Sequence, residues 1–298
     1  MRGSILLRRL SAVALASLAA VGAAPSLATA AAPASPAPEV AEVTYTAKER
    51  KDALAYWTAA RMRKVSESVD LGPTGPLTKE WRGAPVKTVG RLFFVNADGA
   101  DTWCTATAVK SGNRSVVMAA GHCVRRGASP FNTYMDLVFV PGYAKGSRPY
   151  GAFPVRATVT PKSWAEESRT DIAALTVDPV GGRRLTDVVG GQPVGFDRAP
   201  AGAVTSFGYP ATHPQRGEEL LHCSGPAEAA PDDEWRMPCD MSGGASGGPW
   251  LADFDARSGL GTLVSVNSHG DALDGSTTMS GPALGAAARQ VYERAQRV

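Results

Sequence analysis

The larger part of this 298-residue sequence predicts an all-β fold, either an antiparallel sandwich or a pair of barrels. From about residue 85 onward, short runs of β-branched and aromatic residues alternate with Gly, Pro, Asn and Asp, which favour turns. Near its end, residues 283–298 have the composition of a helix. The expected strands are KTVGRLFFV, CTATAVKS, RSVVMAAG, MDLVFV, FPVRATVT, DIAALTV, AVTSFGY, GGPWLA and GTLVSVN.

The first thirty residues predict a secretory signal peptide. Arg2, Arg8 and Arg9 precede an apolar run, which ends in the A-x-A pattern of residues 28–30. A transmembrane anchor is the alternative, but the run is short for a membrane span. We therefore expect residues 1–30 to be removed on export, and the mature protein to be secreted and free of the membrane.

Residues 31–80 predict a separate N-terminal region. The Pro/Ala-rich stretch 31–38 is typical of an extended linker. Thr46 and Glu49 form a capping box at the start of one expected helix over residues 46–65. The region is a propeptide, the preferred interpretation, or an N-terminal extension of the mature protein. Residues 81–298 then form the main domain.

Four cysteines in an oxidising compartment predict two disulfides. Three pairings are possible, and Cys104–Cys123 with Cys223–Cys239 is preferred because each closes a short loop between neighbouring strand-like segments. A zinc site is the competing interpretation, but the sequence has no C-x-x-C pair. We expect no metal and no cofactor.

The net charge of +3 gives no indication of a nucleic-acid partner, because residues 81–298 carry 21 basic and 21 acidic side chains. We expect a monomer.

Three residues have local contexts suited to acyl transfer, which needs a hydroxyl, an imidazole, a carboxylate and backbone N–H donors. His122 follows an apolar strand and directly precedes a cysteine, and Asp171 heads the strand DIAALTV. Ser246 lies in GGASGGPW, where the glycines leave space for a substrate carbonyl and the N–H groups of Gly244 and Ser246 can converge. Taken singly, these residues also suit a core histidine, an exposed strand-end carboxylate and a flexible loop.

Together, the three motifs resemble those of the chymotrypsin-like serine peptidases. AAGHC is similar to their Ala-Ala-His-Cys motif, with Gly121 added. TDIAALTV is similar to their Asp-Ile-Ala-Leu strand and GGASGGPW to their Gly-Asp-Ser-Gly-Gly-Pro loop, in the same order. The resemblance covers about residues 85–298 and is greatest to secreted bacterial trypsin-like members.

The resemblance implies two perpendicular, antiparallel six-stranded β-barrels with the site between them, followed by the C-terminal helix. It implies a secreted serine endopeptidase that acts on protein or peptide substrates. In such an enzyme His122 would be the general base, Asp171 would orient it and Ser246 would attack the scissile carbonyl. Gly244 and Ser246 would form the oxyanion hole, and the Cys104–Cys123 disulfide would brace the histidine.

Ala245 departs from the family pattern. Members activated by trimming have an aspartate here, which pairs with a newly formed N-terminus, and this chain also has no Ile-Val-Gly-Gly stretch near residues 75–90. We therefore expect activity without a buried new N-terminus. The Cys223–Cys239 disulfide and the packing of Trp250 are the expected supports of the loop.

The resemblance also implies a specificity pocket. Asp240 lies six residues before Ser246, where trypsin-like members have the carboxylate that selects Arg or Lys, and Ser265, Val266 and Asn267 would form the pocket wall. His269 keeps open a glutamate preference, as in glutamate-specific relatives.

Two other functions remain alternatives. The first is a secreted binding protein with the peptidase fold and no turnover. The second is an α/β-hydrolase, because GASGG also satisfies G-x-S-x-G. That fold places its histidine after the serine, and here only His269 follows, with no helical segment between.

Overall fold

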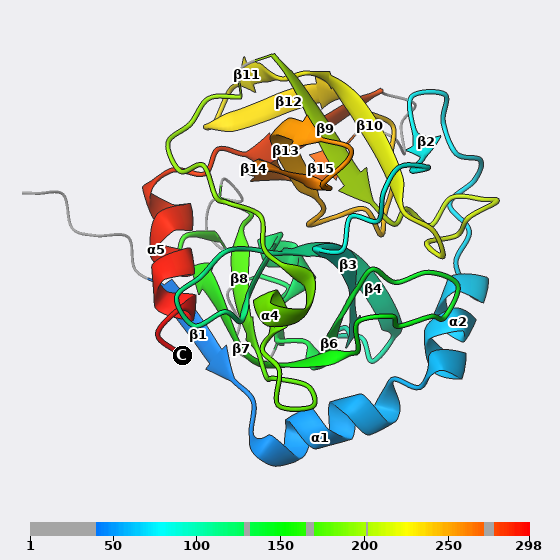
Figure 1. Ribbon diagram of the computed structural model, residues 1–298, viewed down its shortest axis with the longest axis vertical. Coiled ribbons are helices and arrows are strands. Elements are labelled where there is room, and N and C mark those ends of the chain that lie inside the picture. The colour runs from blue at the N-terminus through cyan, green and yellow to red at the C-terminus, as the bar shows by residue number, and fades with distance from the viewer. Residues whose placement is uncertain (1–39, 128–131, 165–169, 201, 271–276) are drawn as a thin grey trace, which may run out of the picture. The chain divides into compact units, whose positions relative to one another are not determined.

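The structure, a computed structural model, describes residues 40–127, 132–164, 170–200, 202–270 and 277–298. The expected signal peptide and linker lie outside the described residues. Antiparallel strands dominate, and they form two layered bodies with a helix at the C-terminal end (Figure 1). The all-β prediction is thereby confirmed.

The first body is a closed barrel. Its seven-stranded sheet has the order β1-β7-β6-β3-β4-β5-β8, and pairing of β7 with β8 closes six of these strands, so that β1 is added outside. The strands are β1 (Val40–Thr44), β3 (Val89–Val95), β4 (Asp101–Ala108), β5 (Val116–Ala119), β6 (Met135–Pro141), β7 (Phe153–Pro161) and β8 (Ala173–Val177).

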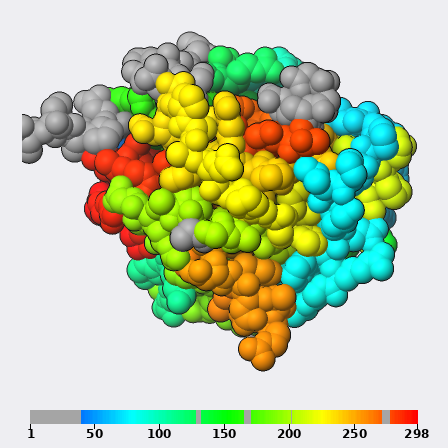
Figure 2. Space-filling model, turned by 90° about the horizontal axis from the view of Figure 1, so that it is seen from above, coloured from blue at the N-terminus to red at the C-terminus, as the bar shows by residue number. Residues whose placement is uncertain are grey.

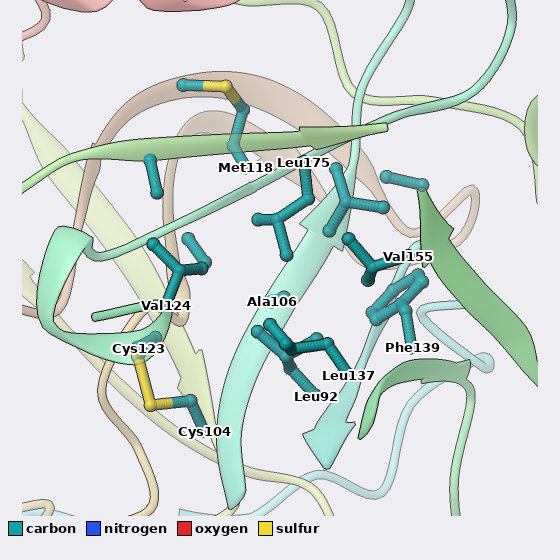
Figure 3. Close-up of a cluster of buried hydrophobic side chains, with 14 of the residues drawn as sticks. Leu92, Cys104, Ala106, Met118, Cys123, Val124, Leu137, Phe139, Val155 and Leu175 are labelled. Carbon is teal, nitrogen blue, oxygen red and sulfur yellow. A yellow bond between two sulfur atoms is a disulfide. The ribbon is translucent and has the colours of Figure 1, made fainter. Parts of the chain in front are cut away.

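Apolar side chains fill this barrel because its strands are buried along most of their length. Leu92, Ala106, Phe139 and Leu175 point into the interior from four strands (Figure 3), and each is fully buried. Burying such side chains is the main favourable term in folding.

The second body consists of two sheets. The five-stranded sheet has the order β14-β13-β9-β10-β2 and the four-stranded sheet the order β11-β12-β16-β15. The strands are β2 (Lys79–Glu80), β9 (Ala203–Gly208), β10 (Leu221–Pro226), β11 (Glu228–Ala230), β12 (Glu234–Pro238), β13 (Pro249–Asp255), β14 (Leu260–Val266), β15 (His269–Gly270) and β16 (Thr278–Pro282). In the described residues the strand pairings divide this body into these two sheets, which together make up the second barrel. The Cys223–Cys239 disulfide links the two sheets where β10 and β12 lie side by side.

The helices are short. They are α1 (Ala47–Tyr56), α2 (Ala59–Glu67), the 3₁₀ turn η1 (Gly121–Cys123), α4 (Leu185–Val189) and α5 (Ala286–Ala295). The described residues include no helix long and apolar enough to cross a membrane.

The single helix expected over residues 46–65 is two helices. The capping box of Thr46 and Glu49 starts α1 as predicted, but α1 ends before Trp57, and the Thr58 side chain accepts from Arg61 N to cap α2. The fully buried Trp57 ring packs against Phe93, and its Nε1 donates to the Asp136 carbonyl (2.6 Å). The chain bends at this position because the tryptophan docks into the first barrel.

The region 40–80 is therefore packed against both bodies. β1 pairs with β7 in the first barrel, and β2 pairs with β10 in the second. In Figure 1, α1 and α2 follow the outside of the first barrel and the chain then rises to the second.

We predict that Trp57→Ala lowers the free energy of unfolding by about 3–5 kcal/mol, because it opens a cavity under α1 and leaves the Asp136 carbonyl unpaired. Urea denaturation followed by circular dichroism measures this. Leu54→Ala is the control, since Leu54 lies on α1 just before Trp57 with 39% of its surface exposed, and it should cost well under about 1 kcal/mol. Equal effects of the two variants would mean that α1 is not docked in solution.

Candidate active site

Asp171 lies at the centre of the candidate site, just before β8. Its carboxylate is almost fully buried and accepts hydrogen bonds from the His122 backbone N–H (2.9 Å), from His122 Nδ1 (2.7 Å) and from Ser268 Oγ (2.6 Å). His122 belongs to the first barrel and Ser268 to the second, so the carboxylate joins the two bodies. Three donors compensate for removing the charge from water.

These contacts shift both pKa values. Burial raises the pKa of Asp171, but the charge of His122 and the hydrogen bonds from His122 and Ser268 outweigh it, and the net shift is downward. Burial lowers the pKa of His122, but the charge and hydrogen bond of Asp171 raise it above its usual value. Asp171 also fixes the orientation of the ring, because the bond to Nδ1 leaves Nε2 as the free ring nitrogen.

The backbone around His122 is closely packed against its neighbours. His122 lies in the turn η1, directly after β5, and the Cys104–Cys123 disulfide ties this turn to β4. A Cβ on Gly121 would lie 3.0 Å from the Trp164 ring and 3.1 Å from Asp171 Oδ1. This crowding accounts for the extra glycine before the histidine.

Thr105 binds the turn that bears Ser246 to the first barrel. It follows Cys104 on β4, its N–H donates to the Ser246 carbonyl (2.8 Å) and its hydroxyl donates to the Gly244 carbonyl (2.8 Å). A Cβ on Gly247 would lie 2.4 Å from the Thr105 carbonyl, so the turn approaches β4 as closely as glycine permits. Ser246 is partly exposed.

Asn267 supports the same turn from the second barrel. It is fully buried, and its Oδ1 accepts from Ser206 Oγ and Trp250 Nε1 (both 2.7 Å), while its Nδ2 donates to the Ala245 carbonyl (2.9 Å). Its backbone carbonyl accepts from Gly247 N (2.7 Å). Ala245 itself is fully buried, so an uncharged amide fixes the position at which other members have a charged aspartate.

Two neighbouring N–H groups of this turn are free. Within the part of the chain that the structure describes, the N–H groups of Gly244 and Ser246 have no acceptor, whereas those of Ala245 and Gly247 donate to Ser242 and Asn267. Gly244 has φ +91°, and the preceding Gly243 carbonyl accepts from Ala211 N. Paired free N–H groups of this kind can bind an oxyanion.

Ser246 lies in the wall of a recess of about 180 Å³. The other described residues lining it are Met241, Ser242, Gly243, Ser268, His269, Gly270 and Met279. Across the described residues, Ser246 Oγ and His122 are not hydrogen-bonded to each other; such bonds are often long before substrate binds.

Asp240 does not line this recess among the described residues. Its carboxylate turns the other way and accepts from Leu77 N and Thr78 N (2.8 Å each) and from the Thr78 hydroxyl. The predicted position of a basic-selective carboxylate is thus occupied by a side chain whose oxygens are already paired.

The predicted pocket wall also differs from the structure. Ser265, Val266 and Asn267 are fully buried, with Ser265 Oγ donating to the Pro282 carbonyl (2.8 Å). The next three residues, 268–270, line the recess instead, because β14 ends at Val266 and the chain emerges only after Asn267.

Cysteine pairing follows the preferred prediction, with disulfides Cys104–Cys123 and Cys223–Cys239. In the described residues, Cys104, His122 and Cys123 are the group with metal-ligand spacing, but the two sulfur atoms are bonded to each other and cannot serve as thiolates.

Solved structures of proteases are similar to this chain. Protease Anisep from Arthrobacter nicotinovorans is 34% identical, with a TM-score of 0.66 over 74% of this chain and 100% of that one. The chain belongs to the chymotrypsin-like serine proteases. Thermostable serine protease AL20 from an extremophilic microorganism is 31% identical, with a TM-score of 0.64 over 72% of this chain and 98% of that one.

A more distant likeness supports the protease fold alone. A Glu endopeptidase is 17% identical, with a TM-score of 0.61 over 76% of this chain and 99% of that one. No protein-family model matches the chain, and no curated protein matches it significantly.

We predict that the pKa of His122 lies above 6.5 and that of His222 below it, because burial without a charged partner lowers the latter. Imidazole proton NMR across a pH titration measures both in one sample. Asp171→Asn should lower the pKa of His122, since burial then acts without the opposing charge, and leave that of His222 unchanged. An unchanged His122 titration in this variant would contradict the assigned ion pair.

Proposed function

We propose that this chymotrypsin-fold serine protease is an active endopeptidase that cleaves peptide bonds through Ser246, His122 and Asp171. The observation that carries the proposal is the buried Asp171 carboxylate, which holds His122 by two hydrogen bonds beside the turn that bears Ser246. Ser246 Oγ attacks the scissile carbonyl while His122 Nε2 takes its proton, and an acyl-enzyme forms as the amine leaves with that proton. Water then hydrolyses the acyl-enzyme by the same steps.

The oxyanion of each tetrahedral intermediate is bound by the N–H groups of Gly244 and Ser246. Their freedom from protein acceptors in the described residues supports this role, as does the anchoring of the adjacent carbonyls by Ala211 and Thr105. A donor of this type contributes about 3–4 kcal/mol to transition-state stabilisation in comparable enzymes. A binding protein without turnover gains no support from this arrangement.

We infer that the recess beside Ser246 selects an uncharged, apolar side chain at P1, the substrate residue before the scissile bond. Met241 and Met279 supply its apolar surface, and Asp240 is turned away and paired. His269 is the titratable residue among its described lining, and its Nε2 already meets the Glu234 carboxylate at 3.0 Å. Among the described lining residues, a charged P1 side chain would therefore be desolvated without a free partner.

Two features support action outside the cell. Both disulfides suit an oxidising compartment, and the expected signal peptide precedes the folded region.

Replacement of the serine tests the mechanism. Ser246→Ala should reduce kcat/KM by roughly 10⁴-fold or more and abolish labelling by a fluorophosphonate, with the label located by peptide mass spectrometry. His122→Ala should abolish labelling as well. Ser258→Ala is the control, because Ser258 lies on an exposed turn and, within the described residues, its hydroxyl bonds only to neighbours in that turn, Asp255 and Leu260 N. Label on a serine other than Ser246 would contradict the mechanism.

A peptide library that varies P1 tests the recess. We expect Leu, Met or Phe at P1 to be cleaved at least about tenfold faster than Arg, Lys or Glu, measured as kcat/KM. A basic or acidic residue as the best P1 side chain would contradict the inference.

A further inference from the structure

The segment 71–80, here called the strap, joins α2 to the second barrel through β2. Leu71 N donates to the Ala211 carbonyl (3.1 Å), and Thr74 N donates to the His213 carbonyl (3.0 Å). Figure 2 shows the strap, in cyan, on the surface alongside the second body. The strap is thus held by main-chain hydrogen bonds as an integral part of this body.

Asp240 clamps the centre of the strap. Two strap N–H groups and one strap hydroxyl donate to its carboxylate, and Asp240 as a whole is 9% exposed. The fit is close, because a Cβ on Gly75 would lie 2.2 Å from Asp240 Oδ2. A nearly buried carboxylate that receives three donors from one segment would be left unpaired if that segment departed.

The clamp adjoins the proposed substrate site. Asp240 lies between Cys239, which is disulfide-bonded, and Met241, the first residue of the recess. The other end of the strap also contacts this loop: a Cβ on Gly243 would lie 2.9 Å from Leu71 Cδ1. Gly243 directly precedes Gly244, whose N–H is free to bind the oxyanion, so the strap contacts both ends of residues 240–243.

We propose that Asp240 is a positioning residue: by clamping the strap, it holds the recess and the oxyanion-binding turn in their active arrangement. Residues 40–80 then remain in the mature enzyme and stabilise this loop. In relatives that are activated by trimming, a newly formed N-terminus has this role. This inference rests on the proposed function, and it favours the N-terminal extension over the propeptide.

Variants of the clamp test its effect on catalysis. Thr78→Val removes one donor while keeping the side-chain volume, and Asp240→Asn removes the charge and one acceptor. Each should lower kcat and the rate of fluorophosphonate acylation about tenfold, and Thr78→Ser should restore both to within twofold. The thermal midpoint is measured in parallel.

Thr46→Ala is the matched control, because Thr46 caps α1 in the same N-terminal region but contacts only the first turn of that helix. It should lower the thermal midpoint and leave kcat unchanged. If the clamp variants also lose only stability, the clamp is merely structural and the proposal is overturned.

The mass of the active species gives an independent test. The secreted full chain is labelled with a fluorophosphonate, and the mass of the intact labelled protein is measured by mass spectrometry. We expect the labelled species to contain residues 40–80. A labelled species that begins after Glu80 would overturn the clamp and uphold the proposed function, whereas absence of label on any folded species would overturn the proposed function itself.

Discussion

The arrangement of the site depends on one buried charge, the carboxylate of Asp171. Its two oxygens take hydrogen bonds from His122 in the first barrel and from Ser268 in the second, so the two bodies can meet in only one register without leaving a donor or the carboxylate unpaired. The same contacts raise the pKa of His122. One interaction therefore determines how the bodies join and makes the imidazole a better proton acceptor.

A second set of contacts makes the Ser246 turn rigid without an ion pair. The path from His122 to Ser246 runs through Cys123, its disulfide to Cys104, and then Thr105, which binds the carbonyls of the turn. On the other side, Asn267 uses both acceptor and both donor positions of its amide inside the protein. Neutral groups whose hydrogen bonds are all satisfied need no charge compensation, which explains how Ala245 can replace an aspartate.

The sequence predicted the nine strands with regular apolar patterns and the meeting of His122 with Asp171. It did not predict β10, β12 or β16, because these strands contain glycine, proline or charged residues and depend on distant partners. The wall of the recess beside Ser246 was expected at residues 265–267, but residues 268–270 line it, since the pattern of β14 does not show that Asn267 is still inside. Nor can local sequence indicate that Asp240 faces Leu77, which lies 163 residues earlier. Periodicity reports which residues are buried, but the partners of a buried polar group come from the tertiary fold.

The packing of residues 40–80 also bears on how the chain acquires its structure. β1 pairs with residues 157–161, and β2 pairs with Leu221 and His222, so both strands must wait for partners that are synthesised much later. Contacts of such sequence separation close large loops and slow folding. Until then, Trp57 and Met62 are exposed to water, and the Asp240 carboxylate has no donors. A chain that stops short of residue 240 cannot form the clamp, so under the proposed mechanism catalytic competence would be a late event in biogenesis.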